Sequence, residues 1–242
     1  MYSKGKSEKK LISELHTIYE DEYIIAIEKP AGLLSIRDGY KPDLPNVHSI
    51  LQQRAQKIWI VHRLDKETSG VMIFAKNDDA HRKLNLQFEH HLISKIYLTI
   101  VWGQFNQINQ TVDLPLIINA DRKHRTRVTK EYGKVAITHI NLIHQYHQFA
   151  YISVIPETGY THQIRAHLSE IGHPILGDIL YGNLQKEVKN KVDQDSTIHA
   201  SRLFLHCHKL IFTHPVFERV IQLQSPVPLE FNELLRKIDK YY

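Results

Sequence analysis

Hydrophobic residues in this chain fall into short runs separated by Gly, Pro, Asn, Asp and charged residues. The runs rich in β-branched and aromatic residues lie at residues 23–27, 58–61, 71–75, 96–102, 136–142, 149–155, 202–212 and 220–223. Short runs of this composition, bounded by turn residues, predict β-strands. Residues 29–32 (KPAG) end the first run with a turn.

Helical spacing and capping residues predict two helices in the first half of the chain and one near its C-terminal end. Asn46 is placed to cap a helix that runs to about residue 55, and Asn77 or Asp78 to cap a second. A last helix is expected after Pro228, over residues 229–238. The apolar positions of the first two helices are Val47, Ile50, Leu51 and Leu84, Leu86, Phe88, Leu92.

A further helix is predicted over residues 162–171, with Thr161 as its N-cap and Gly172 just past its end. Its apolar face consists of Ile164, Leu168 and Ile171. These three residues stand at i, i+4 and i+7, which places Arg165 on another face of the helix.

Strands outnumber helices and do not alternate with them as βαβ units require. The expected fold class is therefore α+β, with a mixed, mostly antiparallel β-sheet core and flanking helices. We expect one domain over residues 18–242, preceded by a polar, lysine-rich tail over 1–17. Residues 184–200 are rich in Lys, Asp and Gln and are read as a surface helix or a mobile surface insertion.

The cysteine count and the distribution of apolar residues indicate in which compartment the protein is expected. A single cysteine, Cys207, excludes an internal disulfide and any zinc site that needs two thiolates from this chain. Residues 1–10 lack the apolar core of a secretory signal, and no apolar run approaches the roughly 20 residues of a membrane span. We therefore expect a cytoplasmic protein that does not associate with membranes.

Positive charge is concentrated in one segment. The net charge is +5, with 31 Lys and Arg against 26 Asp and Glu. Residues 122–130 (RKHRTRVTK) contain Arg122, Lys123, Arg125, Arg127 and Lys130. This cluster is either a surface that contacts the phosphates of a nucleic acid or a solvated hairpin edge whose charge blocks strand pairing.

Residues 62–70 (HRLDKETSG) lie between two predicted core strands and place Asp65 two positions after Arg63. A charged loop on a rigid base is a common way to present a reactive group. The alternative is an ordinary exposed ion pair of small energetic effect. The hydroxyl residues and Gly70 that follow are suited to fixing the loop backbone around the carboxylate.

Several separated motifs resemble those of the RluA family of pseudouridine synthases, which rearrange uridine in RNA. They are residues 20–23 (EDEY), 29–33 (KPAGL), 62–70, 95–103 (KIYLTIVWG), 158–168 (TGYTHQIRAHL), 172–178 (GHPILGD), 181–182 (YG) and 202–206 (RLFLH). The motifs occur in the family's order, from residue 20 to about residue 215. The resemblance implies a pseudouridine synthase catalytic domain.

The same resemblance implies roles for individual residues. Asp65 matches the family's catalytic aspartate, Tyr97 its active-site tyrosine, and Arg165 the arginine that pairs with the aspartate. Arg63 matches an arginine that enters the RNA stack where the target base was. His62 is grouped with Arg63 as an RNA-binding candidate that supports its position, and the alternative is an ordinary loop histidine.

The implied reaction breaks the bond between N1 and C1′ of uridine, turns the uracil over and joins C5 to C1′. No redox step occurs, so we expect no cofactor, no metal and no nucleotide. The carboxylate of Asp65 can add to the sugar, add to the ring, or remove a proton from C2′. His206, Cys207 and His208 would alternate between the faces of a strand, which argues against a metal site.

Residues 97–103 and 112–117 are most similar to the branch of the family that modifies both 23S rRNA and a tRNA anticodon stem-loop. One or both RNAs are therefore the expected partner, with a monomer as the simplest state. The chain departs from the family pattern at Tyr160, where arginine or a similar residue is common, and in the high positive charge of residues 122–130.

Two other functions fit parts of the pattern. A glycoside hydrolase also cleaves a bond at an anomeric carbon, and Glu67 or Glu157 could serve as the second carboxylate it needs. An RNA-binding assembly factor would keep the fold without turnover. A Gly-rich stretch at residues 172–178 lacks the spacing of a phosphate-binding loop and is explained by turns.

Overall fold

The computed structural model describes residues 15–54, 57–182 and 200–241. The chain forms two compact units: unit 1 comprises Met1–Lys95 and Cys207–Pro226, and unit 2 comprises Ile96–His206 and Val227–Tyr242. Strands β5 (Ser94–Trp102) and β11 (Leu205–Thr213) each contribute residues to both units. Most of the predicted tail and of the 184–200 segment lies outside the described residues.

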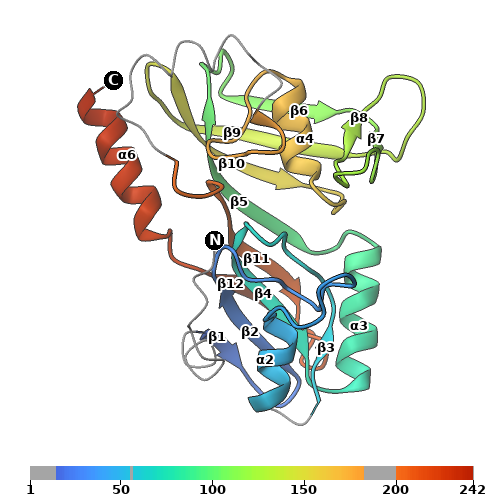
Figure 1. Cartoon of the computed structure of the whole chain (residues 1–242). Helices are drawn as coiled ribbons and strands as arrows, with labels where there is room; N and C mark the ends of the chain where they lie inside the picture. Colours follow the sequence, from blue (N-terminus) through green and yellow to red (C-terminus); the bar gives the residue numbers. More distant parts are fainter. Residues whose placement is uncertain (1–14, 55–56, 183–199, 242) are drawn as a thin grey trace. The chain divides into compact units, whose positions relative to one another are not determined.

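Unit 1 is a sheet with the strand order β1-β2-β4-β11-β12 (Figure 1). The strands are β1 (His16–Glu20), β2 (Ile24–Lys29), β3 (Trp59–Ile60), β4 (Ser69–Ala75), most of β11, and β12 (Val220–Gln224). β3 pairs with the end of β4, and every residue of β4 is buried. The pairs β1–β2, β2–β4, β3–β4 and β11–β12 are antiparallel.

Two helices belong to unit 1, α2 (Val47–Arg54) and α3 (Asp78–Glu89). Their predicted caps are confirmed: the Asn46 side chain accepts from the Ser49 amide at 2.9 Å, and Asn77 accepts from the Ala80 amide at 2.9 Å. One prediction for α3 is wrong, because Leu86 and Leu92 are exposed. The buried face instead follows i, i+4 and i+8 through Ala80, Leu84 and Phe88, which pack on the sheet core.

Unit 2 contains four neighbouring antiparallel sheet strands in the order β5-β10-β9-β6 (Figure 1). Its remaining elements are β6 (Asn109–Asp113), β7 (Leu116–Ile117), β8 (Arg127–Val128), β9 (Ile137–Gln145), β10 (Phe149–Pro156), α4 (Gln163–Glu170) and α6 (Leu229–Tyr241). β7 and β8 form a small separate pair. The predicted α+β class with mostly antiparallel sheets is confirmed.

Helices α4 and α6 cover opposite faces of the unit 2 sheet. Ile164 and Leu168 of α4 pack with Ile152 of β10, as the predicted apolar face requires. Phe231 of α6 packs instead with Phe149 of β10. Residues 149 and 152 are an odd number of positions apart in one strand, so their side chains leave the sheet on opposite sides.

The start of α4 differs from the prediction. Thr161 is not the N-cap, because the helix begins at Gln163 and the N-cap position is His162, in the left-handed region at φ 57°. The Thr161 carbonyl accepts a hydrogen bond from the Thr126 hydroxyl at 2.6 Å, which ties the loop to another segment. At the other end Gly172 has φ 86°, as the predicted position past the helix requires.

Two smaller boundaries also differ. β1 begins at His16, so residues 16–17 of the predicted tail belong to a strand. β11 begins at Leu205, three residues later than predicted, because Phe204 bonds to the backbone of Ile100 and Leu176 outside the regular strand. Among the described residues, no helix is long and apolar enough to cross a bilayer.

Gly70 in β4 lies directly against the backbone of β11. It has φ 120°, and a Cβ there would lie 2.1 Å from the Cys207 carbonyl oxygen. Because that obstacle is backbone in a neighbouring strand, it cannot move aside without breaking the sheet. We predict that Gly70→Ala lowers the free energy of unfolding by about 3 kcal/mol, through overpacking and a disfavoured backbone angle.

Urea denaturation will measure this effect. Gly39→Ala is the matched control, since a Cβ at Gly39 would have no heavy atom within 4 Å and the residue does not have a positive φ. A Gly70→Ala protein as stable as the control would show that the two strands separate more easily than their packing implies.

Candidate functional site

The loop that carries Asp65 joins β3 to β4, and its backbone is fixed on both sides of the residue. The Asp65 carbonyl accepts from the Thr68 amide at 3.1 Å and closes a turn. The Ser35 hydroxyl donates to the Leu64 carbonyl at 2.6 Å and accepts from the Leu64 amide at 3.1 Å. These bonds hold the half-buried Asp65 at one position on the surface of unit 1.

Lys29 supports the same loop from below, which sequence reasoning missed when it read residues 29–32 only as a turn. The Lys29 side chain is fully buried, and its ammonium donates to the carbonyls of Pro30 at 2.9 Å, Leu33 at 2.6 Å and Lys66 at 3.0 Å. A buried ammonium needs such partners, because taking it out of water is costly. The available signal was a lysine at the end of an otherwise apolar strand.

The charged groups that the sequence singled out in the 62–70 motif differ in exposure. Arg63 is exposed, whereas Asp65 is half-buried. Glu67, the second carboxylate of the glycosidase reading, is exposed, and its carboxylate lies 3.8 Å from the Lys66 ammonium. An exposed ion pair of this length contributes little to stability.

The His62 ring is held in place by contacts within unit 1. Its Nε2 accepts a hydrogen bond from the Ile73 amide at 3.0 Å, and its ring stacks on Phe88 with centroids 4.8 Å apart. Burial, reinforced by the nearby Lys95 charge, lowers the pKa of His62 to about 3. The ring is therefore neutral near pH 7, and this geometry suits support of the neighbouring loop better than a charged contact to phosphate.

Arg165 projects from α4 and is held by Asp178, a residue to which sequence analysis gave no role. Arg165 Nε donates to Asp178 Oδ2 and Nη2 donates to Oδ1, both at 2.7 Å. The side chains are 6% and 0% exposed. This bidentate ion pair fixes the plane of the guanidinium as well as its position. The only sequence feature that pointed to Asp178 was its place at the end of the 172–178 motif.

A buried chain of polar groups fixes α4 itself. The Thr158 hydroxyl donates to Gln163 Oε1 at 2.8 Å, and Gln163 Nε2 donates to Thr138 Oγ1 at 3.0 Å. His167 bonds to Thr138 Oγ1 through Nδ1 and to the Leu114 carbonyl through Nε2, both at 2.9 Å. Since a carbonyl only accepts, Nε2 carries the proton, and burial lowers the pKa of His167 so that the ring stays neutral.

Tyr97 lies in β5 opposite Val154 of β10 and is half-buried. Its ring packs against the cluster that contains Ile164 and Leu168 of α4. Tyr97 and Arg165 therefore both belong to the α4 side of unit 2. Asp65 and Arg63 belong to unit 1. The expectation that Arg165 pairs with Asp65 joins residues of different units and stays a prediction.

The basic segment, residues 122–130, belongs to unit 2, and its cations differ in exposure. Arg122, Lys123, Arg127 and Lys130 are exposed. Arg125 is half-buried instead, and its Nε donates to Asp121 Oδ2 at 2.6 Å. Hydrogen bonds from Arg125 lower the pKa of the Asp121 carboxyl, so the pair stays charged. Arg125 thus shapes the loop, while the exposed cations remain accessible to a polyanion.

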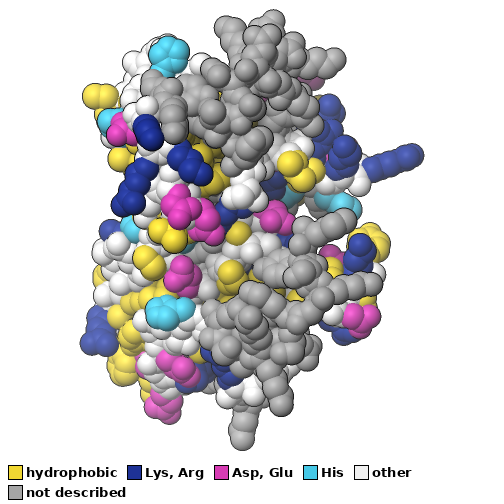
Figure 2. Space-filling model, turned by 60° about the vertical axis from the view of Figure 1, so that its left-hand side comes forward, with side chains coloured by type: hydrophobic (Ala, Val, Ile, Leu, Met, Phe, Trp, Pro, Cys, Tyr) yellow, Lys and Arg dark blue, Asp and Glu magenta, His cyan; other side chains and the backbone are white. Residues whose placement is uncertain are grey.

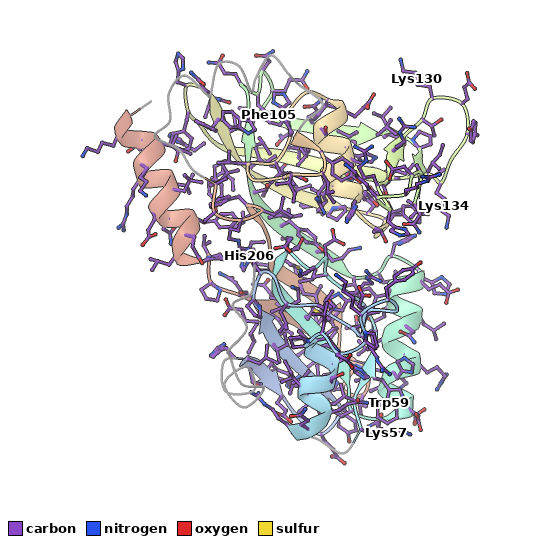
Figure 3. The ribbon with its side chains drawn as sticks, viewed as in Figure 1. Lys57, Trp59, Phe105, Lys130, Lys134 and His206 are labelled. Carbon is purple, nitrogen blue, oxygen red and sulfur yellow. The ribbon has the colours of Figure 1, made fainter. Side chains whose placement is uncertain are left out.

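Lys130 and Lys134 both lie on the loop between β8 and β9 (Figure 3). The Lys134 ammonium is 5.3 Å from the centre of the Tyr160 ring. Arginine or a similar residue is common in the family at the position of Tyr160, and in this chain a lysine lies over the tyrosine ring instead. Figure 2 shows a face on which Lys and Arg side chains are interspersed with Asp and Glu.

Within the described part of the chain, no group of three or more His, Cys, Asp or Glu side chains is arranged to hold a metal ion. His206 and Cys207 are both fully buried, and His208 bonds through Nδ1 to the Ser225 carbonyl at 2.7 Å. The HCH sequence is accordingly part of the core of β11 rather than an open cluster.

Comparisons with known proteins agree on one family. A family model described as RNA pseudouridylate synthase matches residues 23–170. Dual-specificity RNA pseudouridine synthase RluA of Vibrio vulnificus (strain CMCP6) is 36% identical over 203 residues, covering 82% of this chain and 77% of that protein. Ribosomal large subunit pseudouridine synthase D of Pseudomonas aeruginosa is 35% identical over 237 residues, covering 92% of this chain and 71% of that protein.

A solved structure, Human RNA Pseudouridylate Synthase Domain Containing 4, superposes with a TM-score of 0.78. It is 24% identical and covers 96% of this chain and 97% of that one. At this identity the likeness shows the fold, and it confirms the fold expected from the sequence motifs.

The low pKa of His62 predicts a pH dependence of stability. The pKa is about 3 in the folded protein and about 6.5 when unfolded, so below pH 6.5 the unfolded state binds the proton more readily. The stabilisation is complete above pH 6.5 and is lost as the pH falls toward 3. Lowering the pH from 7 to 5 should therefore reduce the free energy of unfolding by about 2 kcal/mol through His62.

Urea denaturation of wild type and His62→Gln at both pH values will check this. Glutamine keeps a hydrogen-bond acceptor without titrating, so the variant should lose less stability on acidification. His147→Gln, at an exposed histidine, should behave as wild type. Equal pH dependence in wild type and His62→Gln would contradict the assignment.

Proposed function

This chain belongs to the RluA-type family of RNA pseudouridine synthases, and from that premise we propose that it isomerises specific uridines in 23S rRNA, in a tRNA anticodon stem-loop, or in both. Asp65 is the catalytic residue of the proposal. A relative named for the ribosomal large subunit supports an rRNA target, and one named for dual specificity supports more than one RNA target. The observation that carries the assignment is the half-buried Asp65 on a loop fixed by Ser35 and Lys29.

The chemistry needs one carboxylate and no external reagent. The bond from N1 to C1′ breaks, C5 bonds to C1′, C5 loses its proton and N1 gains one. The product has the same atoms and electrons as the substrate, so the reaction is an isomerisation. A carboxylate at a fixed position can act on the sugar, on the ring, or on the C2′ proton, and each route starts from the same placement of Asp65.

Arg165 is proposed to pair with the Asp65 carboxylate and balance its charge in the substrate-bound site. Asp178 accepts from Arg165 Nε and Nη2 and fixes the plane of the guanidinium. A guanidinium is suited to this role because it holds its donors in a fixed plane.

Tyr97 and Arg63 are proposed to handle the base. The Tyr97 ring offers a flat face on which uracil can stack, worth about 1–3 kcal/mol for a base on an aromatic ring, and its hydroxyl is assigned to handling the C5 proton. Arg63 is exposed and planar, so it is suited to fill the gap that a flipped uridine leaves in the RNA stack. His62 supports this loop from the core.

The Asp65 assignment predicts that Asp65→Asn abolishes the reaction, because an amide is neither a nucleophile nor a base at neutral pH. Release of tritium from C5-labelled uridine in RNA should fall at least roughly a thousandfold in single turnover. RNA affinity should stay within about threefold, since the substitution keeps the shape of the side chain. Pseudouridine mapping of RNA from cells complemented with either protein will identify the target uridines.

Glu67→Gln is the matched control, because it removes an exposed carboxylate two residues away and should leave the rate unchanged. Substantial turnover by Asp65→Asn would refute the catalytic role. A gene whose Asp65→Ala form fully restores cell function would favour the assembly-factor alternative.

The exposed cations of the basic segment predict a change in salt dependence. Arg122→Gln should reduce the slope of log affinity against log salt by about 0.7 if it meets a single-stranded phosphate. Arg236→Gln, an exposed arginine on α6, makes the same charge change elsewhere and should leave the slope unchanged. Equal slopes for Arg122→Gln and wild type would assign the segment to the solvated-edge reading.

A further inference from the structure

The segment that carries the exposed cations, residues 115–135, is called here the basic hairpin. Its strands β7 and β8 pair at Leu116 and Val128, and Leu116 also pairs with Lys134 through two 2.9 Å backbone hydrogen bonds. Leu116 then packs in one buried cluster with Ala166 of α4 and Tyr181. The underside of the hairpin therefore rests on the residue next to Arg165 and on Tyr181.

The Tyr181 hydroxyl holds the middle of the hairpin. The Thr126 amide donates to this hydroxyl at 2.7 Å, and the hydroxyl donates to the Thr126 carbonyl at 3.1 Å. His162 Nδ1 lies 3.2 Å away and completes its contacts. The hydroxyl thus gives its proton to Thr126 and accepts from the same residue. We call the bonds between Tyr181 and Thr126 the latch.

The ring of the same tyrosine lies over the arginine of the proposed active site. The Arg165 guanidinium carbon is 5.1 Å from the centre of the Tyr181 ring, within the range of a cation–π contact. Asp178 supports both partners: its Oδ1 accepts from Arg165 Nη2 at 2.7 Å and from the Tyr181 amide at 3.1 Å. One side chain thus touches the hairpin backbone with its hydroxyl and Arg165 with its ring.

We propose that Tyr181 is a positioning residue that couples RNA binding on the basic hairpin to the placement of Arg165. This inference rests on the proposed function, since it takes the exposed cations to bind RNA and Arg165 to act beside Asp65. RNA phosphates held by Arg122, Arg127 and Lys130 stabilise the docked hairpin, and through the latch they stabilise the orientation of Tyr181 over Arg165. By linkage, a fixed Arg165 favours the docked hairpin in return.

The basic hairpin has a second anchor that does not involve Tyr181. The Thr126 hydroxyl donates to the Thr161 carbonyl at 2.6 Å, directly before α4. Thr126 is 1% exposed and Tyr181 is 3% exposed, so water does not replace these bonds when they are removed. The hairpin can therefore be loosened from either side, which gives two independent tests.

Tyr181→Phe removes the hydroxyl and keeps the ring over Arg165. The expected result is a roughly tenfold fall in the single-turnover rate of pseudouridine formation at saturating RNA, the size expected when a buried hydrogen bond is lost. The dissociation constant for RNA should rise by a smaller factor, at most about threefold, because the docked hairpin is less favoured while the cations that contact phosphate are unchanged. Tyr40→Phe, at a tyrosine that is 88% exposed, is the matched control and should keep the wild-type rate.

A double-mutant cycle separates coupling from a merely structural role. In the wild-type background Arg122→Gln should lower both RNA affinity and the single-turnover rate. In the Tyr181→Phe background it should lower affinity by the same factor without lowering the rate further, because the path from hairpin to Arg165 is already broken. Two rate effects that multiply would overturn the coupling.

Thr126 provides the second arm if Tyr181→Phe folds poorly. Thr126→Ser keeps the hydroxyl bond to Thr161 and should keep the rate. Thr126→Val removes that bond and should reproduce the rate loss with an equally small change in affinity. Wild-type rates in Thr126→Val and Tyr181→Phe would overturn the proposal while leaving the proposed function intact. An inactive wild type, with no pseudouridine formed in any RNA, would instead overturn the proposed function and the coupling with it.

Discussion

The buried ion pair between Arg165 and Asp178 is the interaction on which unit 2 depends. Two charges with side chains 6% and 0% exposed are tolerable only when each satisfies the other with good geometry, as the paired 2.7 Å bonds do. Because Asp178 also binds the Tyr181 amide, the loop after α4 is organised around the same carboxylate. The arginine, the tyrosine and the hairpin above it consequently form one connected arrangement.

Unit 1 solves the same physical problem with a different charge. The Lys29 ammonium donates to three backbone carbonyls, one of which belongs to the loop of Asp65. Buried charge in both units thus fixes loops rather than helices or strands. Loops fixed in this way are suited to carry groups whose position matters within fractions of an ångström.

Residue type alone does not tell which cations of the basic segment are accessible. Arg122 and Arg125 look equivalent in the sequence, yet Arg122 is exposed and Arg125 is bound to Asp121. The difference comes from the backbone turn that brings residues 121 and 125 together, with His124 at φ 54°. Thr161 gives a similar lesson, since its residue type suits an N-cap, yet the helix begins at Gln163 with His162 at the N-cap position.

Local spacing and contiguous motifs were enough to predict most strands, the caps at Asn46 and Asn77, the apolar face of α4 and the family, because each of these depends on residues close together in the chain. Only the tertiary structure showed which residues bind the buried polar and charged side chains. Lys29 meets Lys66, Arg165 meets Asp178 and Tyr181 meets Thr126 across 37, 13 and 55 positions, respectively. No local pattern encodes such pairs, since they depend on which loops the sheets bring together.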